Sequence, residues 1–216
     1  MRLILVRHGR TVANVMQALD TAFPGHPLDD VGLREADGLP GRLKEAGLLE
    51  GLGSLWVSPI LRARQTIAPI EATTGLSATV DSGLREVLAA DLEMNTDARS
   101  VACYVDTTRA WMAGRPACRI PGSPEDGHDT LQRFDDAVGR IAEQTVRAGD
   151  QAALLVSHGT ALRLWTSLKA APGGGVAPLW IAERPMRNTG ITVVDGDPGA
   201  GWSLTSWDDG AWDQAS

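Results

Sequence analysis

Two short runs of consecutive apolar residues, 3–6 and 152–156, restrict the fold of this chain most strongly. An apolar run of this length, without alternating polar residues, is typical of a strand whose two faces are both buried. Stretches with helical spacing separate these runs, and strands that alternate with helices favour a parallel sheet covered on both sides. We therefore expect an α/β fold, a three-layer sandwich with a mostly parallel central sheet and helices on both faces. Because no linker or repeat divides the sequence, residues 1–216 are expected to form a single domain.

The same patterns predict the individual elements. Thr11 is a candidate helix cap, and Pro69 should kink or shorten the helix that contains it. The composition of residues 121–130 and of the Gly- and Pro-rich residues 171–178 predicts loops. The expected strands are 3–6, 55–57, 78–80, 152–156, 191–194 and 203–206, and the expected helices are 33–43, 60–73, 98–112, 131–146 and 160–169.

The composition argues against several classes of protein. Of 216 residues, 43% are apolar and 22% charged, which is enough hydrophobic material for a sizeable core. The formal net charge is −7 and the basic residues are scattered, so we expect no nucleic acid partner. Cys103 and Cys118 are too few for a disulfide framework or a zinc site, which favours a reducing compartment. Without a signal-peptide core or an apolar stretch of about 20 residues, we expect no membrane contact and a cytoplasmic protein.

Polar residues follow three of the predicted strands, where ligand sites of open α/β sheets lie. They are Arg7-His8-Gly9, Ser58-Pro59 with Arg62, and Ser157-His158-Gly159. Arg7 beside His8 should lower the pKa of the imidazole and favour its neutral, nucleophilic form. Two guanidiniums near a helix N-terminus suit a dianionic phosphate group.

Other interpretations of the histidines remain open at this point. A structural histidine, whose ring nitrogens are hydrogen-bonded at a helix N-terminus, explains either His-Gly pair alone about as well as a functional site does. The two pairs together with Arg7 favour a site. A metal centre on His8 and His158 lacks a third ligand at a convincing spacing, and the cation beside His8 opposes it.

The order and content of these motifs resemble the histidine phosphatase superfamily, in its phosphoglycerate mutase-like branch. The resemblance runs from position 3 to about position 163. Its blocks are LVRHGRT at 5–11 with Asn14, Pro27-Leu28 with Gly32, SPILRARQT at 58–66, LRE at 84–86 and VSHG at 156–159.

The resemblance implies a role for each matching residue. His8 is the nucleophile that forms a phosphohistidine, and Glu86 is the acid that protonates the leaving oxygen and later draws a proton from water. Arg7, Arg62 and His158 hold the phosphoryl oxygens, and Asn14 is a further donor. The expected catalytic residues are thus His8, Glu86, His158, Arg7 and Arg62, and the expected phosphate-binding residues are Arg7, His8, Asn14, Arg62, His158 and Gly159. No metal and no cofactor is expected. Without the family, Glu86 could also be a structural carboxylate paired with Arg85.

The sequence departs from the family pattern in two segments. Residues 87–95 read VLAADLEMN and lack the Arg-His-Tyr-Gly block of the cofactor-dependent mutases, which favours a phosphatase. Residues 124–129 read PEDGHD, and two interpretations are open. The segment places Glu125 or His128 near the site, or it forms a loop in solvent; we favour the solvent loop. A helical lid insertion is expected at about 90–130, where Trp111 is a candidate for the leaving-group side. Trp207 and Trp212 indicate either a dimer contact or a tail that folds back.

These observations predict a metal-independent phosphomonoesterase that hydrolyses a small phosphorylated metabolite through phospho-His8. The expected partner is a small-molecule phosphate ester, and a homodimer is left open. One alternative is a mutase of the phosphoglycerate mutase type, which returns the phosphoryl group to a second hydroxyl. Another is a catalytically silent phosphate-binding module.

Overall fold

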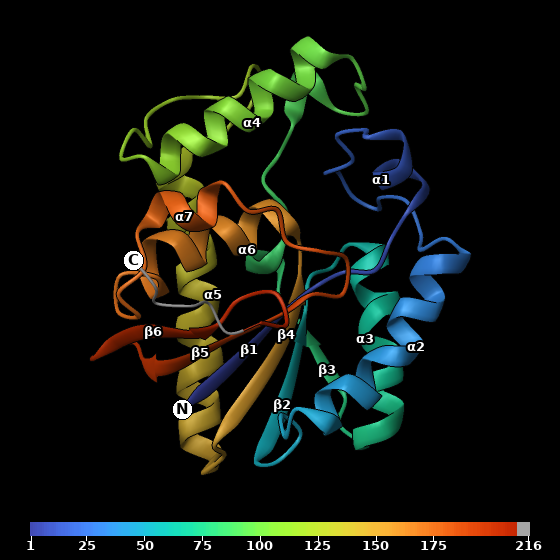
Figure 1. Ribbon diagram of the computed structural model, residues 1–216, viewed down its shortest axis with the longest axis vertical. Helices are drawn as coiled ribbons and strands as arrows, with labels where there is room; N and C mark the ends of the chain where they lie inside the picture. Colours follow the sequence, from blue (N-terminus) through green and yellow to red (C-terminus); the bar gives the residue numbers. More distant parts are fainter. Residues whose placement is uncertain (211–216) are drawn as a thin grey trace.

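A six-stranded sheet forms the centre of the computed structural model, which describes residues 1–210 (Figure 1). The strand order is β3-β2-β4-β1-β5-β6. β1, β2, β3 and β4 pair in parallel, whereas β5 pairs antiparallel with β1 and β6 pairs antiparallel with β5. This mixed, mostly parallel sheet confirms the predicted fold class. The strands are β1 (Arg2–Arg7), β2 (Leu52–Val57), β3 (Ala78–Val80), β4 (Ala152–Ser157), β5 (Ile191–Asp197) and β6 (Gly201–Ser206).

Helices cover both faces of the sheet, and each face has its own hydrophobic core. Successive side chains of a strand point to opposite faces. Leu3 and Leu5 therefore join the core under α4 to α7, while Ile4 and Val6 join the core under α2 and α3. The helices are α1 (Val12–Met16), α2 (Asp30–Glu45), α3 (Leu61–Thr74), α4 (Ala98–Met112), α5 (Gly127–Ala148), α6 (Gly159–Trp165) and α7 (Pro178–Ala182).

The expected effect of Pro69 on its helix is wrong in one respect. α3 is not shortened and continues through Pro69 to Thr74. Pro69 is half-exposed, whereas Arg62, Ile67 and Ile70 pack inward along the helix. Pro69 has no backbone N–H to donate to the carbonyl one helical turn earlier, but water can bind that carbonyl on the solvent side of the helix. Packing of the buried face therefore outweighs the lost hydrogen bond.

The predicted loop at 121–130 is also shorter than expected, because α5 begins at Gly127. Asp126 caps this helix by accepting from the backbone N–H groups of His128 and Asp129. Asp129 in turn accepts from the backbone N–H of Asp126, which completes a capping box. The Asp-Gly-His-Asp segment is therefore a helix start.

Two further segments differ in detail from the sequence predictions. The helix expected at 160–169 consists of α6 followed by the π-helical turn η3 (Thr166–Ala170), and α7 begins at the end of the predicted Gly- and Pro-rich loop. Trp207 packs into the larger core with 7% of its surface exposed. This burial favours the interpretation that the tail folds back onto the domain over the interpretation that Trp207 forms a dimer contact. Trp212 lies outside the described residues.

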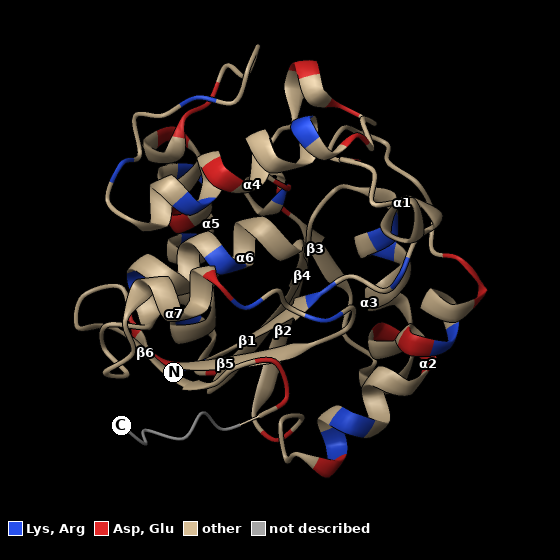
Figure 2. Ribbon diagram, turned by 45° about the horizontal axis from the view of Figure 1, so that its top comes forward, with Lys and Arg blue, Asp and Glu red and all other residues tan. Residues whose placement is uncertain are grey.

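No helix among residues 1–210 has the length and apolar character needed to cross a membrane. Lys and Arg positions are interspersed with Asp and Glu positions along the ribbon (Figure 2). Cys103 and Cys118 are both free thiols.

Candidate active site

The parallel pairing of β1 with β4 brings the two His-Gly pairs together. Arg7 lies opposite Ser157 in the register, so the chain leaves both strands at the same level. The backbone N–H of His8 continues this pairing by donating to the carbonyl of Ser157 at 3.0 Å. As a result, the ring centroids of His8 and His158 are 5.2 Å apart.

The hydrogen bonds of His8 define which ring nitrogen is nucleophilic. Arg62 Nε donates to His8 Nε2 at 3.0 Å. A guanidinium has no acceptor, so Nε2 must carry the lone pair and Nδ1 the proton. Nδ1 accordingly donates to the carbonyl of Gly9 at 2.7 Å. Burial, followed by the charges of Arg62 and Arg7, holds the pKa of His8 well below its ordinary value, so the ring is neutral at pH 7.

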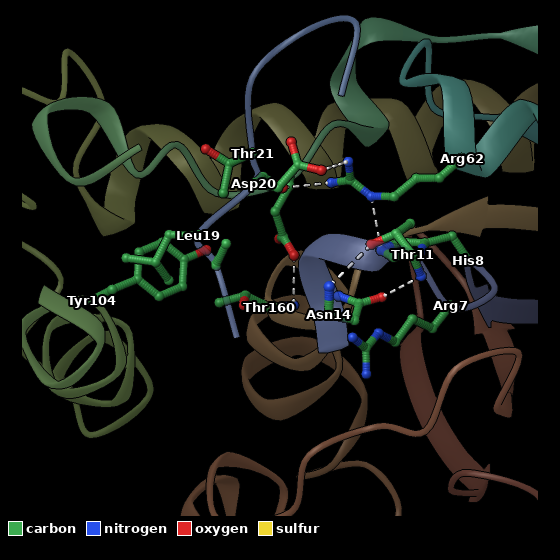
Figure 3. Close-up of a pocket in the computed structure, with 12 residues that line it drawn as sticks. Arg7, His8, Thr11, Asn14, Leu19, Asp20, Thr21, Arg62, Tyr104 and Thr160 are labelled. Atoms are coloured by element: carbon green, nitrogen blue, oxygen red, sulfur yellow. Dashed lines mark hydrogen bonds and ion pairs between the residues drawn. The ribbon is translucent and has the colours of Figure 1, made fainter. Parts of the chain in front are cut away.

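A cavity of about 120 Å³ opens beside His8 (Figure 3). Five of the predicted site residues contribute to it: Arg7, His8, Asn14, Arg62 and Glu86. The other lining residues are Thr11, Ala18, Leu19, Asp20, Thr21, Tyr104 and Thr160. His158 and Gly159 were also predicted to bind phosphate, but neither contributes to the lining.

Arg7 and Asn14 present donors to the cavity. Arg7 Nη1 donates to the carbonyl of Met186 at 2.5 Å, whereas the buried Nε has no partner in the described structure. Burial lowers the pKa of Arg7, yet a guanidinium stays protonated at neutral pH. Asn14 Oδ1 accepts from the backbone N–H of Thr11 and from Asn188 Nδ2, which leaves its amide N–H groups for an anion.

His158 lies behind the cavity and is fully buried. Its Nε2 is 2.7 Å from Ser58 Oγ, and its Nδ1 has no partner within residues 1–210. Burial and then the charge of Arg62 keep the pKa of His158 well below its usual range, so this ring is neutral too. Gly159 allows Arg7 to lie against the start of α6, because a Cβ there would be 3.1 Å from Arg7 Nε.

Glu86 lies at the N-terminus of α6, after the short helical turn η1 (Ser82–Leu84). Its Oε1 accepts from the backbone N–H groups of Val87 and Ala161 at 2.9 and 2.8 Å. Its Oε2 accepts from the backbone N–H of Thr160 at 3.1 Å. The carboxyl group is therefore fixed against the helix and reaches the cavity. The interpretation that Glu86 pairs with Arg85 is wrong, since Arg85 instead binds Glu125.

A family comparison accounts for this arrangement. The model of the histidine phosphatase superfamily (branch 1) matches residues 3–210. The chain belongs to this superfamily. A curated relative, the PE-PGRS family protein PE_PGRS11 of Mycobacterium tuberculosis, is 30% identical over 211 residues, or 94% of this chain. The chain spans 35% of the length of that relative.

Solved structures of histidine phosphatase fold also resemble the chain. A mycobacterial glucosyl-3-phosphoglycerate phosphatase in complex with VO3 is 24% identical, with a TM-score of 0.75 over 96% of this chain and 98% of that one. A phosphoserine phosphatase from Entamoeba histolytica in complex with 3-phosphoglyceric acid is 18% identical, with a TM-score of 0.67 and 96% of each chain covered. At these identities the likeness establishes the fold.

A second group of residues, which sequence spacing did not reveal, holds Glu86 from behind. Arg133 of α5 donates to the carbonyls of Gly83, Arg85 and Glu86 at 2.7, 3.1 and 3.4 Å. Glu125 binds Arg133 Nη2 at 3.1 Å and also binds Arg85. The contacts of Arg133 with residues 83–86 join segments 47 to 50 residues apart, and no local pattern in the sequence indicates them.

The helix α4 contributes to the cavity through a residue other than the predicted one. Trp111 is 1% exposed, packs in the core and donates from Nε1 to the carbonyl of Cys118 at 2.7 Å. Tyr104, two turns earlier, lines the cavity instead. Asp20 is an unpredicted acidic residue in the lining. In the described part of the chain, no group of three or more His, Cys, Asp or Glu side chains has an arrangement that could hold a metal ion.

Proposed function

We propose that this histidine phosphatase superfamily protein is a metal-independent phosphomonoesterase that acts on a small phosphorylated metabolite through His8. The observation that carries this proposal is the state of His8. The ring is neutral, its Nε2 lone pair faces a guanidinium, and it borders a cavity that Arg7, Asn14 and Glu86 also line. This combination provides a nucleophile, cationic donors for a phosphoryl group and a carboxyl group for proton transfer.

In the first step, His8 Nε2 attacks phosphorus and the bond from phosphorus to the ester oxygen breaks. The leaving oxygen takes a proton from the carboxyl group of Glu86, which is a carboxylate in the free protein and takes up this proton as the phosphate dianion binds beside it. Oε2 is the oxygen for this proton, because among the described residues it has a single partner, the N–H of Thr160. The products of this step are the free alcohol, phospho-His8 and the Glu86 carboxylate.

In the second step, a water molecule attacks phospho-His8 from the position of the departed alcohol. Glu86 takes a proton from the water as its oxygen bonds to phosphorus and the bond from phosphorus to Nε2 breaks. Inorganic phosphate leaves, and His8 returns to its neutral form. One carboxyl group thus serves as acid and then as base.

The cationic side chains stabilise the charge on the transferred group. Arg62 Nε, which donates to Nε2 in the free protein, becomes available to a phosphoryl oxygen once Nε2 bonds to phosphorus. Arg7 lines the cavity and offers Nη2, which has no hydrogen-bond partner among residues 1–210 and is not sealed as Nε is. His158 is neutral and does not line the cavity; bound to Ser58 and with its ring centroid 5.2 Å from that of His8, it is proposed to position the nucleophile. Donors fixed in advance stabilise the transition state without reorganisation.

Two observations support hydrolysis over transfer to a second hydroxyl. The chain lacks the Arg-His-Tyr-Gly block of the mutases after Glu86. Structurally similar proteins are named as phosphatases of glucosyl-3-phosphoglycerate and of phosphoserine. The mutase and the silent phosphate-binding module remain as alternatives, and the following assay separates both of them from a phosphatase.

The proposal is tested by phosphate release from an activated aryl phosphate in the presence of a chelator. We expect the native protein to release phosphate under these conditions and His8→Ala to release none. His128→Ala is the matched control, since His128 is exposed at the start of α5 and should have native activity. Loss of native activity on chelation would contradict the metal-independent route. No release from the native protein without chelator would favour a primer-dependent mutase or a silent module.

A further inference from the structure

Asp20 places a carboxylate in a cavity that is built for an anion. Its side chain is 8% exposed. Oδ2 accepts from Arg62 Nη1 at 3.3 Å, and the backbone carbonyl accepts from Arg62 Nη2 at 2.9 Å. A carboxylate repels a phosphate dianion, so phosphate binding alone does not explain it. The mechanism proposed above assigns it no role.

The surrounding loop holds the Asp20 side chain in place. Oδ2 also accepts from the backbone N–H of His26 at 3.0 Å and is 3.1 Å from His26 Nδ1. The next residue is fixed as well, because the backbone N–H of Thr21 donates to Glu93 Oε1 at 2.7 Å. On the other side, the backbone N–H of Leu19 donates to the carbonyl of Asn95 at 3.2 Å. The carboxylate is therefore part of a built site.

The second oxygen of Asp20 remains available to a ligand. All hydrogen bonds of the carboxylate to residues 1–210 involve Oδ2. Oδ1 is not sealed inside the protein, because it is absent from the buried polar atoms that have no partner. In the view of Figure 3, Asp20 lies next to Arg62, and Leu19 and Tyr104 lie on the side away from His8. Asp20 thus contributes to the cavity lining a carboxylate with one oxygen that has no partner among residues 1–210 and is not sealed.

We infer that Asp20 determines specificity by accepting a hydrogen bond from a donor group on the alcohol portion of the substrate, close to the ester oxygen. The substrate class is then a phosphate ester of a small alcohol that carries a hydroxyl or an ammonium group next to the ester carbon. This inference rests on the proposed phosphatase function and extends it to the leaving group. A hydrogen bond to a charged acceptor discriminates by about tenfold or more against an analogue without the donor.

Three esters of matched size test the inference: 2-hydroxyethyl phosphate, 2-aminoethyl phosphate and propyl phosphate. We expect the native protein to hydrolyse at least one donor-bearing ester with a kcat/KM about tenfold or more above that of propyl phosphate. Asp20→Ala should remove this preference. Equal ratios in the native protein and in Asp20→Ala would overturn the inference. Asp37→Asn, which makes the same change in charge as Asp20→Asn but on the exposed side of α2, is the control and should keep the native ratios.

Asp20→Asn distinguishes the two kinds of donor. The amide oxygen still accepts from a hydroxyl, so a preference for 2-hydroxyethyl phosphate should largely remain. A preference for 2-aminoethyl phosphate should fall about tenfold or more, because the negative charge that pairs with ammonium is gone. Either pattern supports the role of Asp20.

A binding measurement separates failure of this inference from failure of the proposed function. If the native protein releases no phosphate from any ester, calorimetric affinities of the same three esters replace kcat/KM. A preference that Asp20→Ala removes would then support the role of Asp20 in recognition while the phosphatase proposal fails. Hydrolysis through His8 with unchanged ratios would overturn the role of Asp20 alone.

Discussion

Replacing Glu86 by glutamine should slow the hydrolysis of alkyl phosphates far more than that of activated aryl phosphates. An alkoxide needs a proton to leave, whereas an activated phenolate does not, so the loss of a general acid affects only the former. General acid catalysis contributes about 10²- to 10⁴-fold. Loss of the general base slows the second step equally for both esters, so the comparison uses kcat/KM, which reports the formation of phospho-His8. We expect kcat/KM for an alkyl ester to fall by that factor and kcat/KM for the aryl ester to fall by less than about tenfold.

The structure also predicts a loss of stability in Glu86→Gln. Gln can keep the acceptor for the N–H groups of Val87 and Ala161, but its amide nitrogen then faces the N–H of Thr160. Loss of a hydrogen bond to a charged group costs about 1.5–3 kcal/mol, and loss of the negative charge at a helix N-terminus costs about 0.3–1 kcal/mol. The sum of about 2–4 kcal/mol corresponds to a decrease in Tm of about 4–16 °C for a chain of this size.

The assay compares steady-state kcat/KM for the two classes of ester, with thermal unfolding measured on the same preparations. Glu71→Gln is the matched control, because Glu71 Oε1 accepts the backbone N–H of Ala78 at 2.8 Å far from the cavity. This variant should lose some stability and keep the native ratio of alkyl to aryl rates. Equal slowing of both esters by Glu86→Gln would refute the assignment of Glu86 as the general acid.

Three further predictions concern the other groups of the site. Arg62→Lys keeps the positive charge but loses the paired N–H donors of the guanidinium, so vanadate inhibition should weaken about tenfold or more. KM should rise and kcat should fall, and unchanged inhibition would contradict a contact between Arg62 and phosphate. Arg133→Met should reduce kcat/KM for alkyl esters more than for aryl esters, because it releases the backbone at Glu86, whereas the exposed Arg140→Met should leave the ratio as it is. The pKa of His8 is held well below its ordinary value of 6.5, so the neutral nucleophile persists as the pH falls below 6.5. In a pH profile of kcat/KM for an aryl phosphate, the decrease on the acid side should therefore lie well below pH 6.5, and a midpoint at 6.5 would refute the account.

The sequence was sufficient to predict the sheet and the meeting of the two histidines. Apolar runs without alternation occur where both faces of a strand are buried, and the register of parallel strands follows once β1 and β4 are neighbours. Two polar residues at equivalent strand ends then emerge side by side. For this reason His8 and His158 could be paired from their positions alone.

Local patterns failed where tertiary contacts or capping decide the structure. α3 continues past Pro69 because its buried face is packed, and α5 starts early because Asp126 and Asp129 form a capping box. Asp20 and Arg133 could not be found by spacing, since the contacts that bring them to the site, with Arg62 and with Gly83, span 42 and 50 residues along the chain. Charged residues of this kind have the same appearance in a sequence as solvated surface charges.

Capture of the phosphorylated enzyme is the most direct test of the central claim. The protein is mixed rapidly with an activated aryl phosphate, quenched in base, and mapped by peptide mass spectrometry. The account predicts one phosphoryl group per chain on His8, stable in base and labile in acid, and none in His8→Ala. Turnover without this adduct, or an adduct on another residue such as His158, would contradict the proposed route.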